Sequence, residues 1–274
     1  MQHNPEFIES RSFTPALVEL RGELSEGYIE NKLQVLENTL PTYERGSPGS
    51  PGSGFHKFRT FSRKDLELHY ESHTLGQQDT IGFFRYRSEN YGQDLVYLED
   101  EFRDAYVVEF DLVDIFWMGS IMIFQGDRGP VNSVIRVLQR EIMDEIKIER
   151  IDLNPEIFFN FDEFGSSTGL RSGQSLSASA EGISTEVSKA QITGDLPATD
   201  FSERGKITHV FNRFEYLDYE ILAHITKDRI NVQSIKTAET DQNISKKSNV
   251  FISIELINEL LEFNQSMSNK KGIR

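Results

Sequence analysis

The segment DAYVVEFDLVDIFWMGSIMIF, residues 104–124, is too long for a single β-strand, and Gly119 and Ser120 offer a turn or bulge within it. We interpret it as belonging to two neighbouring strands, over residues 105–113 and 115–125. The second of these is apolar on both faces. It should therefore lie in the centre of a sheet, covered on both sides.

A helix is expected directly after this second strand. A turn contains Asp127 and Arg128, and the Pro130 that follows is a favoured first residue of a helix. Between residues 130 and 146, six apolar side chains share one helical stripe: Val131, Val134, Ile135, Leu138, Ile142 and Ile146. Residues 146–153, IKIERIDL, then alternate as a strand does. The order strand–helix–strand predicts a connection long enough for a right-handed parallel crossover.

Other segments carry strand signals of their own. Residues 55–61, FHKFRTF, and 82–88, GFFRYRS, are short, aromatic and bounded by turn residues. Residues 206–236 predict two or three antiparallel strands with a hairpin turn at 227–229. These segments indicate a sheet built largely from antiparallel neighbours.

The two ends of the chain complete the expected fold. Residues 252–266 predict an amphipathic closing helix, with Ser253 as its N-terminal cap. The first 40 residues fit either strands or a helix around 28–40. The fold class is therefore α+β: a mixed or antiparallel sheet, one strand–helix–strand crossover unit and a C-terminal amphipathic helix.

Two stretches interrupt this pattern. Residues 46–54, GSPGSPGSG, have no side chain to bury and predict a flexible loop. Residues 165–188 contain eight serines and four glycines, so we expect their first half to be mobile, while the second half permits a weak strand pair. The expected divisions are an N-terminal segment (1–45), the flexible loop (46–54), an α+β core (55–164), a mobile insertion (165–205), strands with the closing helix (206–268) and a basic tail (269–274).

Composition limits the classes of function. The chain has 274 residues and no cysteine, which excludes disulfides, cysteine–zinc sites, iron–sulfur clusters and thiol nucleophiles. Its 29 basic and 44 acidic residues give a net charge of −15, which opposes bulk adhesion to nucleic acid or anionic lipid. The longest apolar run, residues 115–124, is too short to span a bilayer, and the N-terminus lacks a secretory signal. We expect a cytoplasmic protein without a membrane partner.

Basic residues interleaved with aromatic residues form a local exception to the negative charge. Residues 55–64 carry four basic side chains and no acidic one, and residues 83–87 add two arginines. Aromatic rings that stack on bases, beside arginines that follow phosphates, are typical of single-strand binders. The alternative is an ordinary sheet with aromatic residues inside and arginines outside. The candidate binding residues are Lys57, Arg59, Phe61, Arg63, Phe84, Arg85, Tyr86 and Arg87, together with Arg128 in the turn before the helix, where an anion could be held.

An acidic stretch supports a different hypothesis. Residues 94–114 hold eight carboxylates and one arginine, and Glu109 and Asp111 should point the same way from one strand. With Asp114 and Lys147 they could bind Mg²⁺ or Mn²⁺ in a nuclease or phosphodiesterase. The alternative is a charged sheet edge that blocks aggregation.

Three classes of function therefore remain open. The first is a non-enzymatic binding or adaptor protein without a cofactor, whose anionic partner is single-stranded or duplex nucleic acid or an acidic protein surface. The second is the metal-dependent nuclease or phosphodiesterase. The third is a subunit of a larger protein assembly, with the serine-rich segment ordering on contact.

Overall fold

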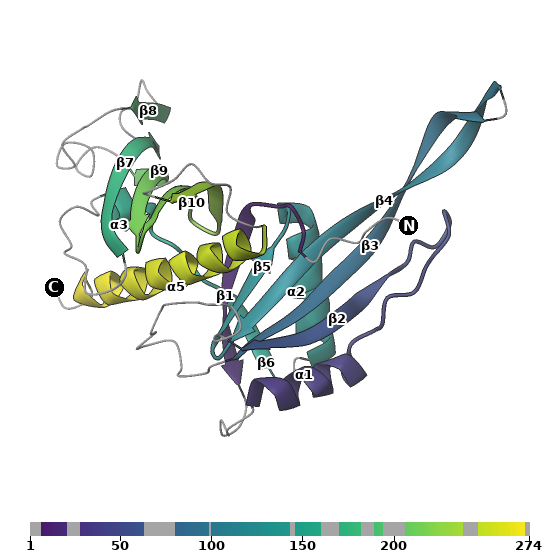
Figure 1. Ribbon diagram of the computed structural model, residues 1–274, viewed down its shortest axis with the longest axis horizontal. Helices are drawn as coiled ribbons and strands as arrows, with labels where there is room; N and C mark the ends of the chain where they lie inside the picture. The colour runs from purple at the N-terminus through teal and green to yellow at the C-terminus, as the bar shows by residue number, and fades with distance from the viewer. Residues whose placement is uncertain are drawn as a thin grey trace. The chain divides into compact units, whose positions relative to one another are not determined.

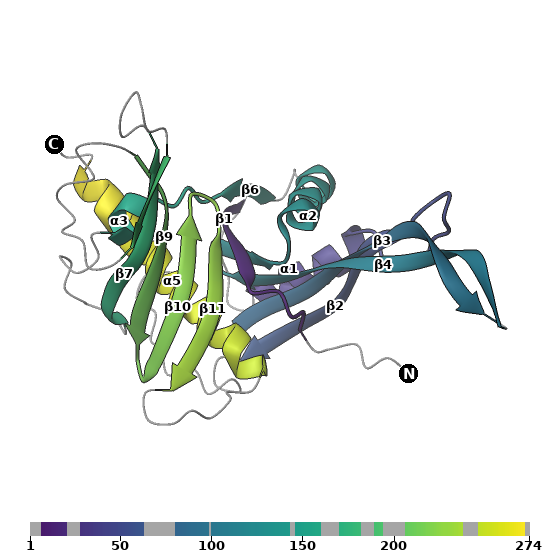
Figure 2. The same ribbon diagram turned by 90° about the horizontal axis from the view of Figure 1, so that it is seen from above.

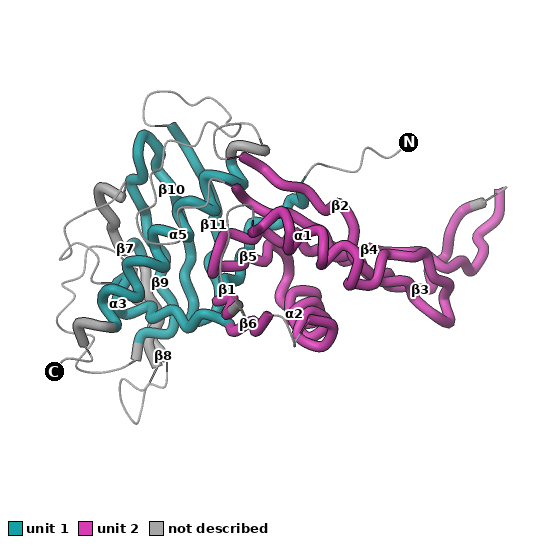
Figure 3. Tube along the Cα trace, turned by 90° about the horizontal axis from the view of Figure 1, so that it is seen from below, with its two compact units in different colours: residues 1–16, 64–77, 150–274 teal, residues 17–63, 78–149 magenta. Residues whose placement is uncertain are grey.

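The computed structural model describes residues 7–20, 28–62, 80–98, 100–142, 146–159, 170–181, 189–193, 206–237 and 246–271. They form a mixed α+β fold made mostly of antiparallel sheet, which confirms the expected fold class at this coarse level. Two compact units are distinguished in Figure 3. Unit 1 comprises residues 1–16, 64–77 and 150–274, and unit 2 comprises residues 17–63 and 78–149.

The sheet of unit 2 follows the strand order β2–β3–β4–β5–β1, and β6 also pairs with β1. Neighbours from β2 to β5 are antiparallel. The strand bounds are β1 Ser12–Leu20, β2 Ser53–Ser62, β3 Thr80–Leu98, β4 Glu101–Met118, β5 Ile121–Gln125 and β6 Ile146–Arg150. The strands expected over 55–61 and 82–88 are thus present in β2 and β3.

The long segment that decides this sheet forms the hairpin β4–β5. The turn at Gly119 and Ser120 is confirmed, and Gly119 adopts a φ of 55° there, a conformation that glycine tolerates without strain. The expected strand boundary near residue 114 is wrong. β4 continues without a break because it pairs with β3 along its whole length. β5 is buried throughout, as expected of a central strand.

Helices α1 (Tyr28–Thr39) and α2 (Arg128–Ile142) cover one face of this sheet (Figure 1). The Tyr28 ring packs edge-on against Trp117 of β4, with centroids 6.1 Å apart. On α2, Val131 lies beside Val113 at Gly126. Trp117 and Val113 are both odd-numbered, so the odd-numbered residues of β4 point toward the helices and the even-numbered ones point away.

The helix expected over 130–146 is α2, but its bounds differ. α2 begins at Arg128 and ends at Ile142, and Ile146 is instead the first residue of β6. The five other stripe residues are buried, as the periodicity predicts. α2 links β5 to β6, and both of these strands pair with β1.

Unit 1 contains a second run of antiparallel strands, in the order β11–β10–β9–β7–β8, and Ser12 and Phe13 of β1 pair with β11. The hairpin turn expected at 227–229 is confirmed, since the Thr226 N–H donates to the Arg229 carbonyl over 2.9 Å. The strand bounds are β7 Leu170–Glu181, β8 Lys189–Thr193, β9 Lys206–Tyr216, β10 Tyr219–Thr226 and β11 Ile230–Thr237.

Two expectations in unit 1 need correction. From Leu170 the serine-rich segment forms β7, because β9 and β8 pair with it. The second half of the segment contributes Ser177–Glu181 of β7, whose partner β8 begins after the segment, at Lys189. The C-terminal helix α5 runs over Lys246–Lys271, so Ser253 lies inside it, and the Ser253 hydroxyl donates to the Asn249 carbonyl over 2.7 Å.

The burial of α5 also differs from that of an amphipathic helix. Its residues from Val250 to Leu261 are all buried, including Glu255 and Glu259. The short helix α3 (Pro155–Phe159) belongs to unit 1 and is held against β9 by the Asn212 side chain, which donates to the Phe158 carbonyl over 2.7 Å. In the part of the chain that the structure describes, none of the helices has the length and apolar character to cross a membrane.

Candidate functional site

β3 and β4 extend past their neighbours in unit 2 as a two-stranded ribbon. The pairing of β2 with β3 ends at Ser88, and the pairing of β5 with β4 ends at Asp114. Residues 89–98 of β3 pair with residues 101–110 of β4, and these segments together with residues 111–113 at their base are called the arm from this point (Figures 1 and 2). An extended two-stranded ribbon presents both of its faces and both of its edges.

One face of the arm carries large apolar side chains that are exposed. Paired residues of an antiparallel ladder share a face, so odd-numbered residues of β3 lie beside even-numbered residues of β4. All five members of this aromatic face obey that parity: Leu95 (62% exposed), Tyr97 (58%), Phe102 (71%), Tyr106 (56%) and Phe110 (41%). A contiguous apolar surface of this kind marks an interaction site in soluble proteins.

The opposite face of the arm is acidic. It presents four carboxylates and one arginine: Asp94, Glu101, Glu109, Asp111 and Arg103. Asp111 accepts a hydrogen bond of 2.6 Å from the Asn90 amide, and the exposed Glu101 and Arg103 approach to 3.5 Å. The arm therefore has one face rich in large apolar side chains, which also carries Asp104 opposite Leu95, and one mainly acidic face, which also carries Val107.

Glu89 holds the glycine-rich loop against the base of the arm. Its carboxylate accepts hydrogen bonds from the Gly46 N–H (2.8 Å), the Gly52 N–H (2.9 Å), the Tyr91 hydroxyl (2.9 Å) and the Tyr43 hydroxyl. Donation by Tyr43, above all, and by the two backbone N–H groups lowers the pKa of Glu89 to about 2. We call this group the Glu89 clamp.

Hydrogen bonds also form within the loop at residues 46–54, for which flexibility was predicted. Ser47 and Ser50 also exchange two backbone hydrogen bonds, of 3.0 and 2.9 Å. Side chains are excluded at Gly46 and Gly52, since a Cβ at Gly52 would lie 2.1 Å from the Glu44 carbonyl oxygen and one at Gly46 would lie 2.1 Å from the Gly52 nitrogen. Because Gly46 and Gly52 have no side chains, the backbone of the loop can approach the Glu89 carboxylate closely.

Arg87 lies next to this clamp, between two aromatic rings. Its guanidinium carbon is 3.6 Å from the centroid of Phe110 and 4.5 Å from that of Tyr43. A guanidinium cation placed over the face of an aromatic ring is attracted to it by the ring's charge distribution. Because Arg87 is an odd-numbered residue of β3, it extends the aromatic face toward the base of the arm.

The predicted basic–aromatic patch is only partly at the surface. Phe84 and Tyr86 point toward the helices and are buried, so they offer no platform for stacking bases. Arg85 is fully buried, and its guanidinium forms an ion pair with Asp114 in which Nη2 and Oδ2 are 2.7 Å apart. These three residues are not available to a partner.

The other predicted binding residues are spread over several elements. Lys57 sits in a bulge of β2 with a φ of 61°, Arg59 is exposed, and Phe61 packs edge-on against Phe83. Arg128 is exposed at the start of α2. Arg63 lies outside the described residues. On the aromatic side of the sheet, the structure places Arg59 and Arg87 on neighbouring strands.

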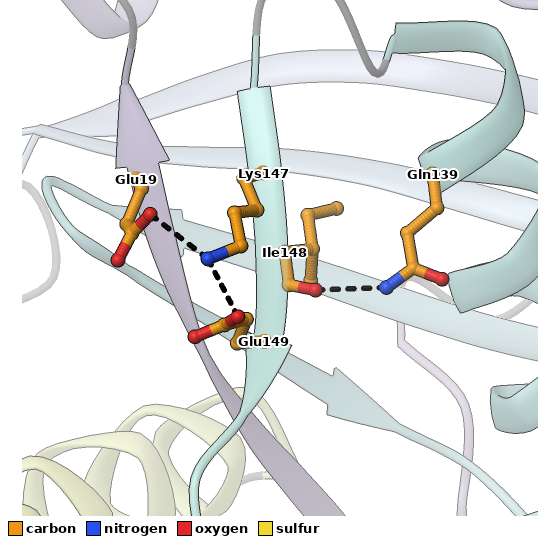
Figure 4. A network of polar contacts seen from close by, with 5 residues as sticks. All are labelled: Glu19, Gln139, Lys147, Ile148 and Glu149. Atoms are coloured by element: carbon orange, nitrogen blue, oxygen red, sulfur yellow. Dashed lines mark hydrogen bonds and ion pairs between the residues drawn. The ribbon is translucent and has the colours of Figure 1, made fainter.

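The residues of the predicted metal site do not come together. Glu109 and Asp111 share a face, as expected, but the unbroken alternation of β4 puts Asp114 on the other face. Lys147 instead pairs with Glu149 (2.6 Å) and Glu19 (3.3 Å), as Figure 4 shows, and these carboxylates raise the pKa of Lys147. Across the described ranges, we find no cluster of three or more histidine or acidic side chains placed to hold a metal ion.

The aromatic face was not predicted from the sequence. Its signal is the recurrence of Phe102, Tyr106 and Phe110 at even-numbered positions of β4, on the same face as Leu95 and Tyr97 of β3. Alternation alone does not distinguish an exposed apolar face from a buried one. In comparisons with known proteins, no family model matches this chain and no curated protein shows significant similarity to it.

Proposed function

We propose that this protein is a binding subunit of a larger protein assembly and that the aromatic face of the arm is its docking surface. The observation that carries the proposal is the exposure of five large apolar side chains on one face of a ribbon. Leaving such a surface in water forgoes apolar burial and invites aggregation. A protein partner that covers the aromatic face would explain why these apolar side chains are present there.

The charge of the arm defines the chemistry of that partner. Residues 94–111 contain seven acidic residues and one basic residue, and seven minus one leaves a net charge of −6. The fitting surface is an apolar groove bordered by lysines and arginines, because complementary charges speed association and reject wrong partners. Nucleic acid, anionic lipid and a second copy of the arm would all bring like charge.

The size of the face is consistent with a specific contact. A fully buried aromatic side chain removes about 150–250 Å² from water, so four half-exposed rings contribute on the order of 400 Å². A standard interface buries roughly 800 Å² on each partner. The aromatic face therefore supplies about half of one partner's share, and the remainder would come from neighbouring polar groups.

Substitution of the two faces tests the proposal. In one variant, Tyr97, Phe102 and Tyr106 become serine, and the matched control is Val107→Ser on the acidic face. Each tagged protein is incubated with an extract of its native cells, and retained proteins are quantified. We expect the wild type and the control to retain the same partner, and the triple variant to lose it at least tenfold. Equal retention by all three proteins would refute the proposal.

Two further measurements test whether a second copy of the chain or a membrane covers the aromatic face instead of a protein partner. Light scattering of the purified protein detects self-association, and sedimentation with vesicles that contain anionic lipid detects membrane binding. We expect a monomer that stays in the supernatant. A dimer or membrane binding that the triple variant abolishes and Val107→Ser preserves would replace the proposed partner.

A further inference from the structure

We infer that Arg87 is a carboxylate-binding subsite at the base of the arm, which receives an acidic side chain or the C-terminal carboxylate of the protein partner. The inference rests on the proposed function, because the carboxylate belongs to the partner that covers the aromatic face. It also assigns a specific role to one arginine of the predicted anion-binding set.

Packing fixes the plane of the guanidinium. Phe110 lies 3.6 Å from its central carbon and Tyr43 lies 4.5 Å from it, measured to the ring centroids. An arginine held this way has already lost most of its rotamer freedom, so binding an anion costs less entropy than at a mobile side chain. The Nε is buried, so the two Nη groups are the donors that an approaching carboxylate can reach.

The hydrogen-bonding capacity of Arg87 is unused in the described part of the chain. Within those residues its side chain makes two ring contacts but no ion pair and no hydrogen bond, and its Nε is buried without an acceptor. Arg85, two residues earlier, is the contrast, since Asp114 binds it through two nitrogens. A guanidinium matches a carboxylate in a bidentate pair, which Arg87 lacks and a partner can supply.

The nearest acidic residue on the same strand face is already committed. Glu89 shares the face of Arg87, but its oxygens accept hydrogen bonds from Tyr43, Tyr91, Gly46 and Gly52. The Glu89 clamp thereby does two things for Arg87. It keeps the Glu89 carboxylate away from the guanidinium, and it holds the Tyr43 ring that forms one wall of the subsite.

Basic side chains gather near the subsite, in contrast to the rest of the arm, with Arg85 paired to Asp114 and Glu89 on the same face. Burial, followed by the charges of Arg85, Lys57 and Arg87, lowers the pKa of the nearby His56 to about 4. Basic side chains at the base of the arm, next to residues 94–111 with their net charge of −6, give the binding surface a direction. A partner with a carboxylate at one end of a basic-rimmed groove fits in one orientation only.

Small ions test the subsite without any partner. The probes are sodium benzoate, whose ring can contact Phe110, the neutral isostere benzamide, and inorganic phosphate. The readout is the Nε–Hε resonance of Arg87 in ¹H–¹⁵N spectra, with the exposed Arg59 as the internal reference. We expect saturable shifts of Arg87 with benzoate, at least fivefold larger than with benzamide and larger than those of Arg59.

Variants decide the outcome. Arg87→Gln removes the charge, and Arg87→Lys keeps the charge but removes the planar pair of donors, so both should lose the benzoate response of neighbouring amides while Arg59→Gln retains it. Equal responses to benzoate and benzamide, or a response that survives in Arg87→Gln, would overturn the inference. A response to phosphate alone would reassign the site to phosphate groups.

This experiment separates the inference from the proposed function. Benzoate binding at Arg87 needs no partner, so a negative result removes the subsite and leaves docking through the aromatic face intact. Conversely, the protein could fail to retain a partner and still bind benzoate. For a retained partner, we expect Arg87→Gln to weaken the complex about tenfold or more, as removal of a hydrogen-bonded charge pair does.

Discussion

The guanidinium of Arg85 and the carboxylate of Asp114 form a buried ion pair between β3 and β4, with Nη2 and Oδ2 2.7 Å apart and both side chains excluded from solvent. The two residues are directly opposite each other in the ladder. This pair withdraws an arginine from the predicted anion-binding patch and a carboxylate from the predicted metal site. Its role is therefore structural.

Removing one member of this ion pair should destabilise the fold, while replacing both members with apolar side chains should not. Arg85→Met or Asp114→Leu alone leaves one buried charge unpaired and should lower the free energy of unfolding by about 3–5 kcal/mol. The double variant should recover most of that loss, because two apolar side chains need no ionic partner. Urea denaturation of all four proteins, analysed as a double-mutant cycle, measures the difference. Equal losses in single and double variants would contradict this account.

The Glu89 clamp should make stability depend on pH in the acid range. The pKa of Glu89 is about 2 in the fold against an ordinary value of 4.5, so its stabilisation is present above pH 4.5 and is lost as the pH falls toward 2. Glu89→Gln should therefore lower the melting temperature most above pH 4.5 and progressively less toward pH 2. Melting curves from pH 2 to 7 check this.

A matched control for that experiment lies on the acidic face. Glu109 is exposed, and Glu109→Gln removes the same charge from the same ribbon. We expect this variant to follow the wild type over the whole pH range. A difference between wild type and Glu89→Gln that stays constant from pH 7 to 2 would show that the Glu89 carboxylate is not stabilised as described.

His56 should remain neutral throughout the physiological range. Burial, and secondarily the charges of Arg85, Lys57 and Arg87, lower its pKa from 6.5 to about 4. Between these values the unfolded chain binds more protons than the fold, so His56 makes stability rise with pH from about 4 to 6.5. The Cε1–H resonance of His56 should not shift between pH 8 and 5.5. A titration midpoint near 6.5 would refute the burial described for this side chain.

The aromatic face should be dispensable for the stability of the fold. Serine at Tyr97, Phe102 and Tyr106 removes side chains that are more than half exposed, so each change should alter the free energy of unfolding by no more than about 0.5 kcal/mol. The same variant should aggregate more slowly at high concentration, because the apolar surface is reduced. Thermal melts and time-resolved light scattering measure the two effects. A much larger decrease in the free energy of unfolding would show that these side chains pack in the core and are not exposed.

Local patterns predicted the elements that depend on local chemistry. The apolar stripe located α2, and the KDR sequence at 227–229 located the hairpin turn. Both follow from periodicity and turn chemistry within a short window. The bounds were less accurate, since Ile146 continued the helical period yet begins β6.

The site residues depended on contacts that are distant in sequence. Strand alternation predicts that Arg85 and Arg87 share a face. It does not predict that Asp114, 29 residues after Arg85, forms an ion pair with Arg85 and not with Arg87. The Glu89 clamp likewise joins residues 37 and 43 positions apart. Register between strands is set by such pairings, and closeness in sequence alone had grouped Asp114 with Glu109, although the two lie on opposite faces of β4.

The most direct test of the docking surface uses two adjacent residues that point to opposite faces of the arm. The photoreactive amino acid benzoylphenylalanine is introduced at Tyr106, on the aromatic face, or at Val107, on the acidic face, and each protein is irradiated in an extract of its native cells. The account predicts a cross-linked partner from position 106 and at least fivefold less of it from position 107. Equal cross-linking from both positions, or none from position 106, would contradict docking through the aromatic face.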